Sequence, residues 1–122
     1  MRGIRGAITV RENTREAILA ATATLLQAMT AQNALDLEEL VSVIFTVTPD
    51  LNQAFPAEAA RQLGWTHVPL LCTMEIPVPG SLARVVRVLM LVNRNVPLSA
   101  VRHVYLGDAA VLRSDLTDPG SA

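Results

Sequence analysis

Three kinds of side chain in this sequence could together bind a small anion: arginines on or beside strand-like segments, a carboxylate at a strand end, and a tyrosine. The arginines are Arg5, Arg87 and Arg113, the carboxylate is Glu75, and the tyrosine is Tyr105. Guanidinium groups bind carboxylates through paired hydrogen bonds. The set suits a compact dianion with a hydroxyl group, in which the arginines bind the carboxylates, Glu75 binds the hydroxyl, and Tyr105 is a further donor.

Arg87 has the most restrictive sequence surroundings of this set. It lies in the run 84–92, where residues 85–92 are otherwise Val, Leu and Met, so both faces of a strand would be apolar, as in a strand covered on both sides. A guanidinium keeps its proton there and needs an anionic partner. An acidic side chain of the same fold, such as Glu75, or an anionic ligand could be that partner, and the residues alone leave both open.

The usual catalytic machinery is missing from the sequence. His67 and His103 lack the spacing of metal ligands, and there is no glycine-rich phosphate loop. Cys72 has no sequence pattern that supplies a base, and all ten basic residues are arginine, which excludes Schiff-base chemistry on a lysine. We therefore expect no metal, no cofactor and no covalent intermediate.

Composition narrows the classes of partner. A net charge of -1 and only four scattered aromatic residues argue against nucleic acid. No apolar stretch approaches the roughly eighteen residues of a membrane span, and the first ten residues lack the apolar centre of a signal peptide. The single cysteine excludes an intrachain disulfide and agrees with a reducing compartment. We expect a cytoplasmic protein.

The elements that must position these residues begin with a strand over residues 3–10. Its alternation places Ile4 and Ile8 on one face, and Arg5 among small residues on the other. A long helix is predicted over about 14–32, opened by Asn13 as N-cap with Glu16 at capping-box spacing.

The remaining segments complete a sheet. Strands are predicted at 40–48, 67–75 and 84–92, and a short helix at 57–63 in which Glu58 and Arg61 could pair with each other. Residues 104–106 and 109–112 predict a last strand pair or one kinked strand. Five strand-like segments with one long helix and short helices indicate an α+β fold with a five-stranded sheet.

Residues 1–113 are expected to form one domain, and the polar segment 114–122 a mobile C-terminal tail. Hydrophobic residues make up 51% of the chain and charged residues 17%, which is more apolar area than a small monomer can hide. With a single long helix, the second face of the sheet has no helix to cover it. Another subunit is expected to cover that face.

Several strings in the sequence resemble the AroH-type chorismate mutases. The most specific are Arg-Gly-Ile-Arg-Gly at 2–6 and Arg-His-Val-Tyr-Leu at 102–106. The segments 48–57 and 68–75, the strand with Arg87 and residues 111–113 also match, in order and over nearly the whole chain. The resemblance implies a homotrimer of small α+β subunits with a mixed sheet, a pseudo-α/β barrel with active sites between neighbouring subunits, and conversion of chorismate to prephenate.

The resemblance also implies roles for individual residues. Arg5 and Tyr105 would bind a substrate carboxylate, Arg87 would face the ether oxygen of the breaking bond, and Glu75 would take the ring hydroxyl. The residues beside that hydroxyl would be Leu71, Cys72, Thr73 and Met74; those from the adjacent subunit would be Phe55, Ala57 and Arg61; those closing the site as the tail orders would be Leu112 and Arg113.

Two positions depart from the family pattern. Leu71 stands where a threonine is usual, which removes a side-chain contact. Glu58 stands where a lysine is usual, which places a negative charge near the entrance for a dianion.

The implied reaction explains the missing machinery. A Claisen-type rearrangement is unimolecular and pericyclic, so the enzyme has to hold the compact conformer and stabilise charge that develops on the ether oxygen. Two alternatives remain at this stage: a trimeric deaminase of reactive imines and enamines, in which an arginine also binds a carboxylate, and a non-catalytic sensor of an aromatic metabolite.

Overall fold

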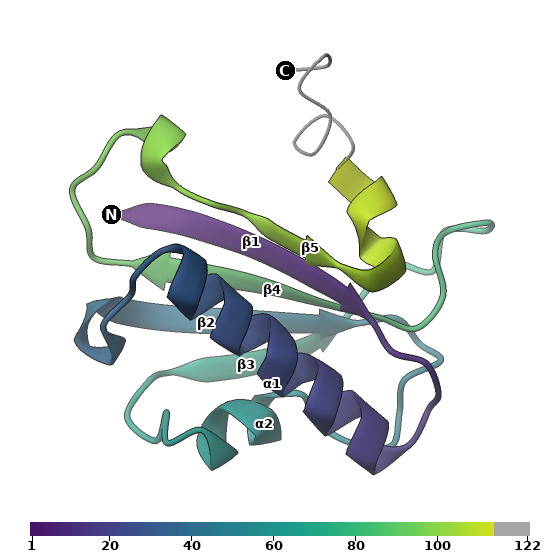
Figure 1. Cartoon of the computed structure of the whole chain (residues 1–122). Helices are drawn as coiled ribbons and strands as arrows, with labels where there is room; N and C mark the ends of the chain where they lie inside the picture. Colours follow the sequence, from purple (N-terminus) through teal and green to yellow (C-terminus); the bar gives the residue numbers. More distant parts are fainter. Residues whose placement is uncertain (114–122) are drawn as a thin grey trace.

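A mixed five-stranded sheet with its helices on one face forms the frame of the computed structural model, which describes residues 1–113 (Figure 1). The strands are β1 (Arg2–Thr9), β2 (Leu40–Val47), β3 (Leu70–Met74), β4 (Val85–Val92) and β5 (Val104–Leu106), in the order β3-β2-β4-β1-β5. β4 pairs antiparallel with β1 and β2, whereas β5 and β3 pair parallel with β1 and β2 respectively. The predicted α+β class is confirmed. The predicted tail, residues 114–122, lies outside the described residues.

Two α-helices and three 3₁₀ segments connect the strands. They are α1 (Arg15–Gln32), α2 (Ala57–Gln62), η1 (Leu37–Glu39), η2 (Leu98–Ala100) and η3 (Gly107–Arg113). None of the helices within residues 1–113 is long and apolar enough to span a bilayer.

The N-cap of α1 differs from the sequence prediction by one residue. Thr14 is the cap, and its hydroxyl accepts from the Ala17 N–H at 3.2 Å. Asn13 instead exchanges two hydrogen bonds with Asn52, at 2.8 and 3.1 Å. The capping box on Asn13 was wrong because its side chain is used in a tertiary contact, while Thr14 is free to satisfy the first turn.

The end of the chain also departs from the predicted strand pair. Only residues 104–106 form a strand, and residues 107–113 turn into η3. Gly107 has a φ of +60°, a left-handed conformation that glycine adopts at little cost, and it ends the ladder with β1. Ala109 is then fully buried against Ala7 and Val85, so its apolar character reflects packing and not strand pairing.

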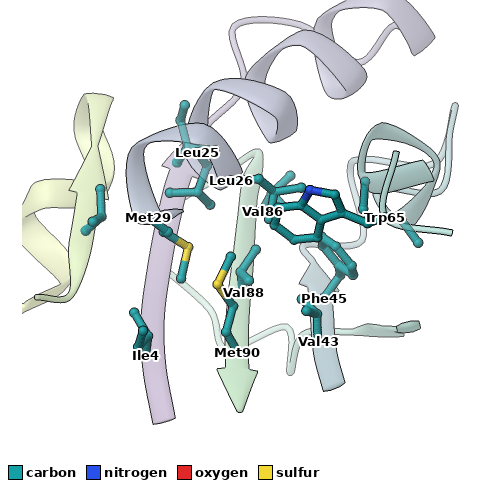
Figure 2. Close-up of a cluster of buried hydrophobic side chains, with 14 of the residues drawn as sticks. Ile4, Leu25, Leu26, Met29, Val43, Phe45, Trp65, Val86, Val88 and Met90 are labelled. Carbon is teal, nitrogen blue, oxygen red and sulfur yellow. The ribbon is translucent and has the colours of Figure 1, made fainter. Parts of the chain in front are cut away.

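The main core lies between α1 and the sheet. Figure 2 shows Met29 and Leu26 of α1 directed at strands that carry Ile4, Val88 and Phe45. The predicted alternation of β1 is confirmed, because Ile4 and Ile8 are buried and Arg5 is exposed. One further contact is close: a Cβ on Gly6 would lie 2.5 Å from the Met29 Sδ. Glycine at this position lets α1 approach β1.

On the face of β4 opposite the helices, Val85 is the one buried residue within residues 1–113, contrary to the expectation of a strand covered on both sides. Val86, Val88 and Met90 are buried under the helices, whereas Arg87 and Leu89 point to the opposite face and are exposed. Leucine at 89 is thus an apolar side chain on an uncovered sheet face. We refer below to the face that carries Arg87 and Leu89 as the open face.

Hydrogen bonds tie the loop before β5 to the end of α1. The buried Asn33 side chain donates to the carbonyls of Met29 and Arg102, at 2.9 and 2.8 Å, and accepts from the Arg102 N–H. The Arg94 guanidinium donates to the carbonyls of Asn33 and Ala34 and to both oxygens of Glu39. These bonds fix the path of the chain towards Tyr105.

Candidate active site

The strand register aligns the candidate site residues in two rows across the open face. Side chains of paired residues share a face of the sheet. One row runs from the β3 edge inward through Leu71, Ile44, Leu89 and Arg5. The adjacent row runs through Thr73, Thr46, Arg87, Ala7 and Tyr105. Residues from five strands, distant in sequence, are therefore neighbours.

A cavity of about 260 Å³ lies over these rows, and we call it the first cavity. It brings together Arg5, Glu75, Arg87 and Tyr105, the four residues proposed above to bind the ether oxygen, one carboxylate and the hydroxyl of the ligand. Its other lining residues are Gly6, Ala7, Ile44, Thr46, Val88 and Leu89. Two cations, an acid and a phenol thus share one small concave surface with mostly apolar walls.

Arg87 is held loosely by the protein's own acids. Its Nε lies 3.7 Å from Glu75 Oε2, beyond hydrogen-bond distance, and its side chain is 48% exposed. No other carboxylate of residues 1–113 lies within ion-pairing distance of this guanidinium. The internal ion pair left open by the sequence therefore forms, but most of the five donors of Arg87 remain available to a ligand.

Glu75 is fixed by a second contact. The Thr46 hydroxyl donates to Glu75 Oε2 at 2.5 Å, and the Glu75 N–H donates to the Val47 carbonyl, which continues the β2–β3 ladder by one residue. The Glu75 side chain is 28% exposed and lines the first cavity, and its Oε1 accepts no hydrogen bond from residues 1–113. It can therefore accept from a hydroxyl group of a ligand.

Arg5 and Tyr105 are placed by the parallel pairing of β1 with β5. The Arg5 N–H donates to His103 Nδ1 at 2.9 Å, just before the β5 ladder begins at Val104. This contact gives the His103 ring a structural role between β1 and the start of β5. Tyr105 packs with Leu112 of η3 in a small apolar cluster built on Ala7, Val85 and Ala109. The side chain of Arg113 lies outside the described residues.

Four other predicted residues line a second cavity, of about 560 Å³. They are Phe55, Cys72, Thr73 and Met74, and Phe55 is 70% exposed there. The remaining walls come from Arg15, Val47, Leu51, Asn52, Gln53, Ala54, Pro56 and Glu58. This second cavity sits where the chain passes from the end of β2 into α2, beside the edge strand β3.

The hydrogen-bonded partner of Glu58 is Arg15, and not Arg61, with which the sequence spacing allowed a pair. Both oxygens of Glu58 accept from the guanidinium of Arg15, each at 2.5 Å, and this bidentate contact lowers the pKa of the carboxyl and raises that of Arg15. A fork-to-fork arrangement across two helices is favoured over a contact along one helix turn.

Four predicted residues lie outside both cavities, and one of them is Leu112, which packs in the small apolar cluster with Tyr105. Ala57 is buried in the main core, so only its backbone could reach a ligand. Arg61 is exposed in the last turn of α2. Leu71 is exposed on the open face at the sheet edge.

The two cavities share no lining residue, and the second reaches around the β3 edge of the sheet, because its wall includes both Cys72 and Thr73. Cys72 pairs with Phe45 and packs against the helix-covered core, whereas Thr73 pairs with Thr46 on the open face. One chain consequently does not place Phe55 and Arg87 around a common ligand.

Some lining residues were not anticipated from the sequence. Ile44 and Thr46 alternate with buried Val43 and Phe45, so the period of β2 could have placed them on the open face. Arg15 gave no such signal, because its partner Glu58 is 43 residues away. Within residues 1–113, no three histidines, cysteines or acids are arranged to hold a metal ion.

The sequence that builds this geometry is similar to that of a known family. Residues 1–116 match the model of the family described as chorismate mutase type I. The chain belongs to this family. The matched range includes every residue that lines the two cavities and every residue of the two rows on the open face.

Individual relatives agree with the family assignment. "Chorismate mutase AroH" of Thermus thermophilus is 61% identical over 117 residues, covering 95% of this chain and 96% of that protein. "Chorismate mutase AroH" of Bacillus subtilis is 45% identical over 118 residues, covering 96% and 93%. The structure of a chorismate mutase from Clostridium thermocellum superimposes with a TM-score of 0.89 at 49% identity, covering 91% of this chain and 99% of that one.

Proposed function

We infer that this protein is a chorismate mutase, an isomerase that converts chorismate to prephenate in the biosynthesis of phenylalanine and tyrosine. The observation that carries this conclusion is the match of nearly the whole chain to the chorismate mutase type I family. The first cavity supports it, because its arginines, acid and phenol suit a hydroxylated dianion. Family membership also favours this function over an imine deaminase or a metabolite sensor.

The proposed mechanism uses fixed charge and shape. The Arg5 guanidinium and Tyr105 hydroxyl bind one carboxylate, and the free oxygen of Glu75 accepts from the ring hydroxyl, so the substrate is held folded with its reacting carbons close together. The carbon–oxygen bond then breaks as the new carbon–carbon bond forms. Arg87 donates to the ether oxygen as negative charge develops on it, which lowers the barrier because the donor is already in place.

We further propose that three chains assemble into a homotrimer, in which the open face of one subunit is covered by the second-cavity side of the next. Two observations support this: the candidate residues are divided between two separate cavities, and Leu71 and Leu89 are exposed on the open face. Burial would surround Arg87 with protein, so its charge would act in a medium of low dielectric constant. Phe55 and Arg61, with the backbone at Ala57, would complete the site, and Leu112 and Arg113 would close it.

The expected location of the enzyme is the cytoplasm. One support is the single cysteine, which forms no disulfide within the described residues. The other is the proposed substrate, which is made and consumed in amino-acid biosynthesis.

The direct test follows the loss of chorismate absorbance with pure protein, compared with Arg87→Ala. We expect wild-type protein to turn over chorismate, and the variant to lose about 10²- to 10³-fold in kcat/KM, the scale for removing one preorganised donor to a developing oxyanion. Arg102→Ala is the matched control, since Arg102 is exposed and lies outside both cavities. An Arg87→Ala protein that stays assembled and is fully active would refute the assigned role.

A further inference from the structure

The Arg15–Glu58 ion pair stands on the wall of the second cavity. Arg15 opens α1 and Glu58 lies in the first turn of α2, so the pair joins two helices. Both contacts measure 2.5 Å, and both residues share the cavity with Phe55, Cys72 and Met74. The pair is thus adjacent to residues for which a substrate contact is proposed.

Glu58 carries its negative charge at neutral pH, as an ordinary glutamate does, and hydrogen bonding to Arg15 lowers its pKa further. Chorismate carries two carboxylates. An unpaired carboxylate on this wall would repel such a dianion, whereas the pair with Arg15 has no net charge. The location of Glu58 alone predicts weak binding of chorismate, because its charge would repel the substrate carboxylates. The bidentate contact with Arg15 removes that repulsion.

We propose that Arg15 is a positioning residue for substrate binding: it holds and neutralises the Glu58 carboxylate so that the second cavity can receive a dianion. This inference rests on the proposed function and on the proposed subunit arrangement. Arg15 acts through Glu58 and does not bind the reacting atoms. A purely mechanical link between α1 and α2 would contribute little here, because the two side chains are 49% and 29% exposed and solvent screens the pair.

Four variants test this role: Arg15→Gln, Glu58→Gln, the double variant, and Arg11→Gln as control. Arg11 is an exposed arginine that lies outside the second cavity, and its substitution makes the same change in net charge. Arg15→Gln is expected to raise KM for chorismate about three- to tenfold, the effect of one partly screened charge, and to change kcat less. Added salt should reduce this increase. Glu58→Gln should have a KM equal to or below that of wild type, the double variant should return to near the wild-type KM, and the control should match wild type.

The pattern of rescue decides the outcome. An unchanged KM in Arg15→Gln, or a double variant as impaired as Arg15→Gln, would overturn the inference, because Arg15 would then be dispensable or act independently of Glu58. Dissociation constants for chorismate provide a second readout. Wild-type protein that binds chorismate without turnover would overturn the proposed function, while the ranking of the variants' dissociation constants would still decide the role of Arg15. Wild-type protein that does not bind chorismate would overturn both.

Discussion

At the scale of the residue, the proposed mechanism relies on side chains that keep one charge state around neutral pH. Arginine stays protonated at every accessible pH, and the proposed reaction transfers no proton. We therefore expect kcat to be nearly flat around neutral pH and to show no solvent isotope effect. Measurement of the steady-state rate against pH, in ordinary and heavy water, checks this. A bell-shaped profile would indicate acid–base catalysis and count against the mechanism.

Stability, in contrast, should depend on pH through Glu39. Hydrogen bonds from Arg94 and from the Asp36 N–H lower the pKa of this carboxyl from 4.5 to about 2. The ion is favoured by the folded state, so its contribution is complete above pH 4.5 and is lost as the pH falls towards about 2. In urea unfolding, Glu39→Gln should be less stable than wild type at neutral pH, and the difference should shrink on acidification. Glu38→Gln, which removes a neighbouring acid without an ion pair in residues 1–113, should show no such difference.

Single residues also mark where sequence reasoning failed. Asn13 and Thr14 are both residue types that can cap a helix. Asn13 bonds instead to Asn52, which is distant in the sequence, and Thr14 is the cap. Glu58 had Arg61 at helical spacing but bonded to Arg15. In each case a tertiary partner outweighed a local one, and no pattern within a window of a few residues contains that information.

At the scale of the element, the position of α1 on the sheet depends on Gly6. A Cβ there would meet Met29 Sδ at 2.5 Å and Leu25 Cδ1 at 3.1 Å. Gly6→Ala should therefore destabilise the fold by about 1 to 3 kcal/mol, the range for overpacking a core. Met29→Ala makes room for the added methyl group. Gly6→Ala should therefore lower the free energy of unfolding less in the Met29→Ala background than in the wild-type background.

Gly3→Ala is the matched control on the same strand. Its Cβ would meet only leucine side chains at 3.5 Å or more, on the opposite face. Chemical unfolding of wild type and of the four variants, which are Gly6→Ala, Met29→Ala, their combination and Gly3→Ala, checks the prediction. Equal stability of the Gly3→Ala and Gly6→Ala proteins would contradict it.

The strands were the most predictable elements, and the reasons are physical. In β2, buried Val43 and Phe45 alternate with partly exposed neighbours, and in β1 the buried Ile4 and Ile8 lie on the face opposite the exposed Arg5, so the period of two revealed both strands and their faces. In β4 both faces read as apolar, because Leu89 and Leu91 share a face with Arg87 that the chain leaves open. The segment after Gly107 resembled a strand in composition, but it packs as a 3₁₀ turn against Ala7.

At the scale of the molecule, the open face predicts association. Leu89, 37% exposed, lies in the middle of it beside Arg5 and Ile44. Leu89→Glu would bury a charge at the proposed interface and should convert a particle of three times 13.1 kDa into smaller species. Sedimentation equilibrium measures this directly.

Leu37→Glu is the matched control, since Leu37 is 42% exposed but lies in η1, away from the open face. A wild-type protein that sediments as a monomer, or a Leu89→Glu variant that stays trimeric, would contradict the proposed assembly.

The candidate site was predictable in its chemistry but not in its division. The residue types and the family resemblance together indicated Arg5, Glu75, Arg87 and Tyr105, and the register places them in one cavity. Only the structure shows that Phe55 lines a separate cavity. That separation depends on strand pairing over the whole chain.

The division of the proposed site between two separate cavities has a consequence for how two defective copies of the gene combine. If each active site forms between two subunits, a subunit defective at Arg87 and another defective at Phe55 can assemble into one trimer. One active site of that trimer can then contain an intact Arg87 and an intact Phe55. Two inactive gene products would then restore activity when produced together, and a defect in either one would be partly masked by its neighbour.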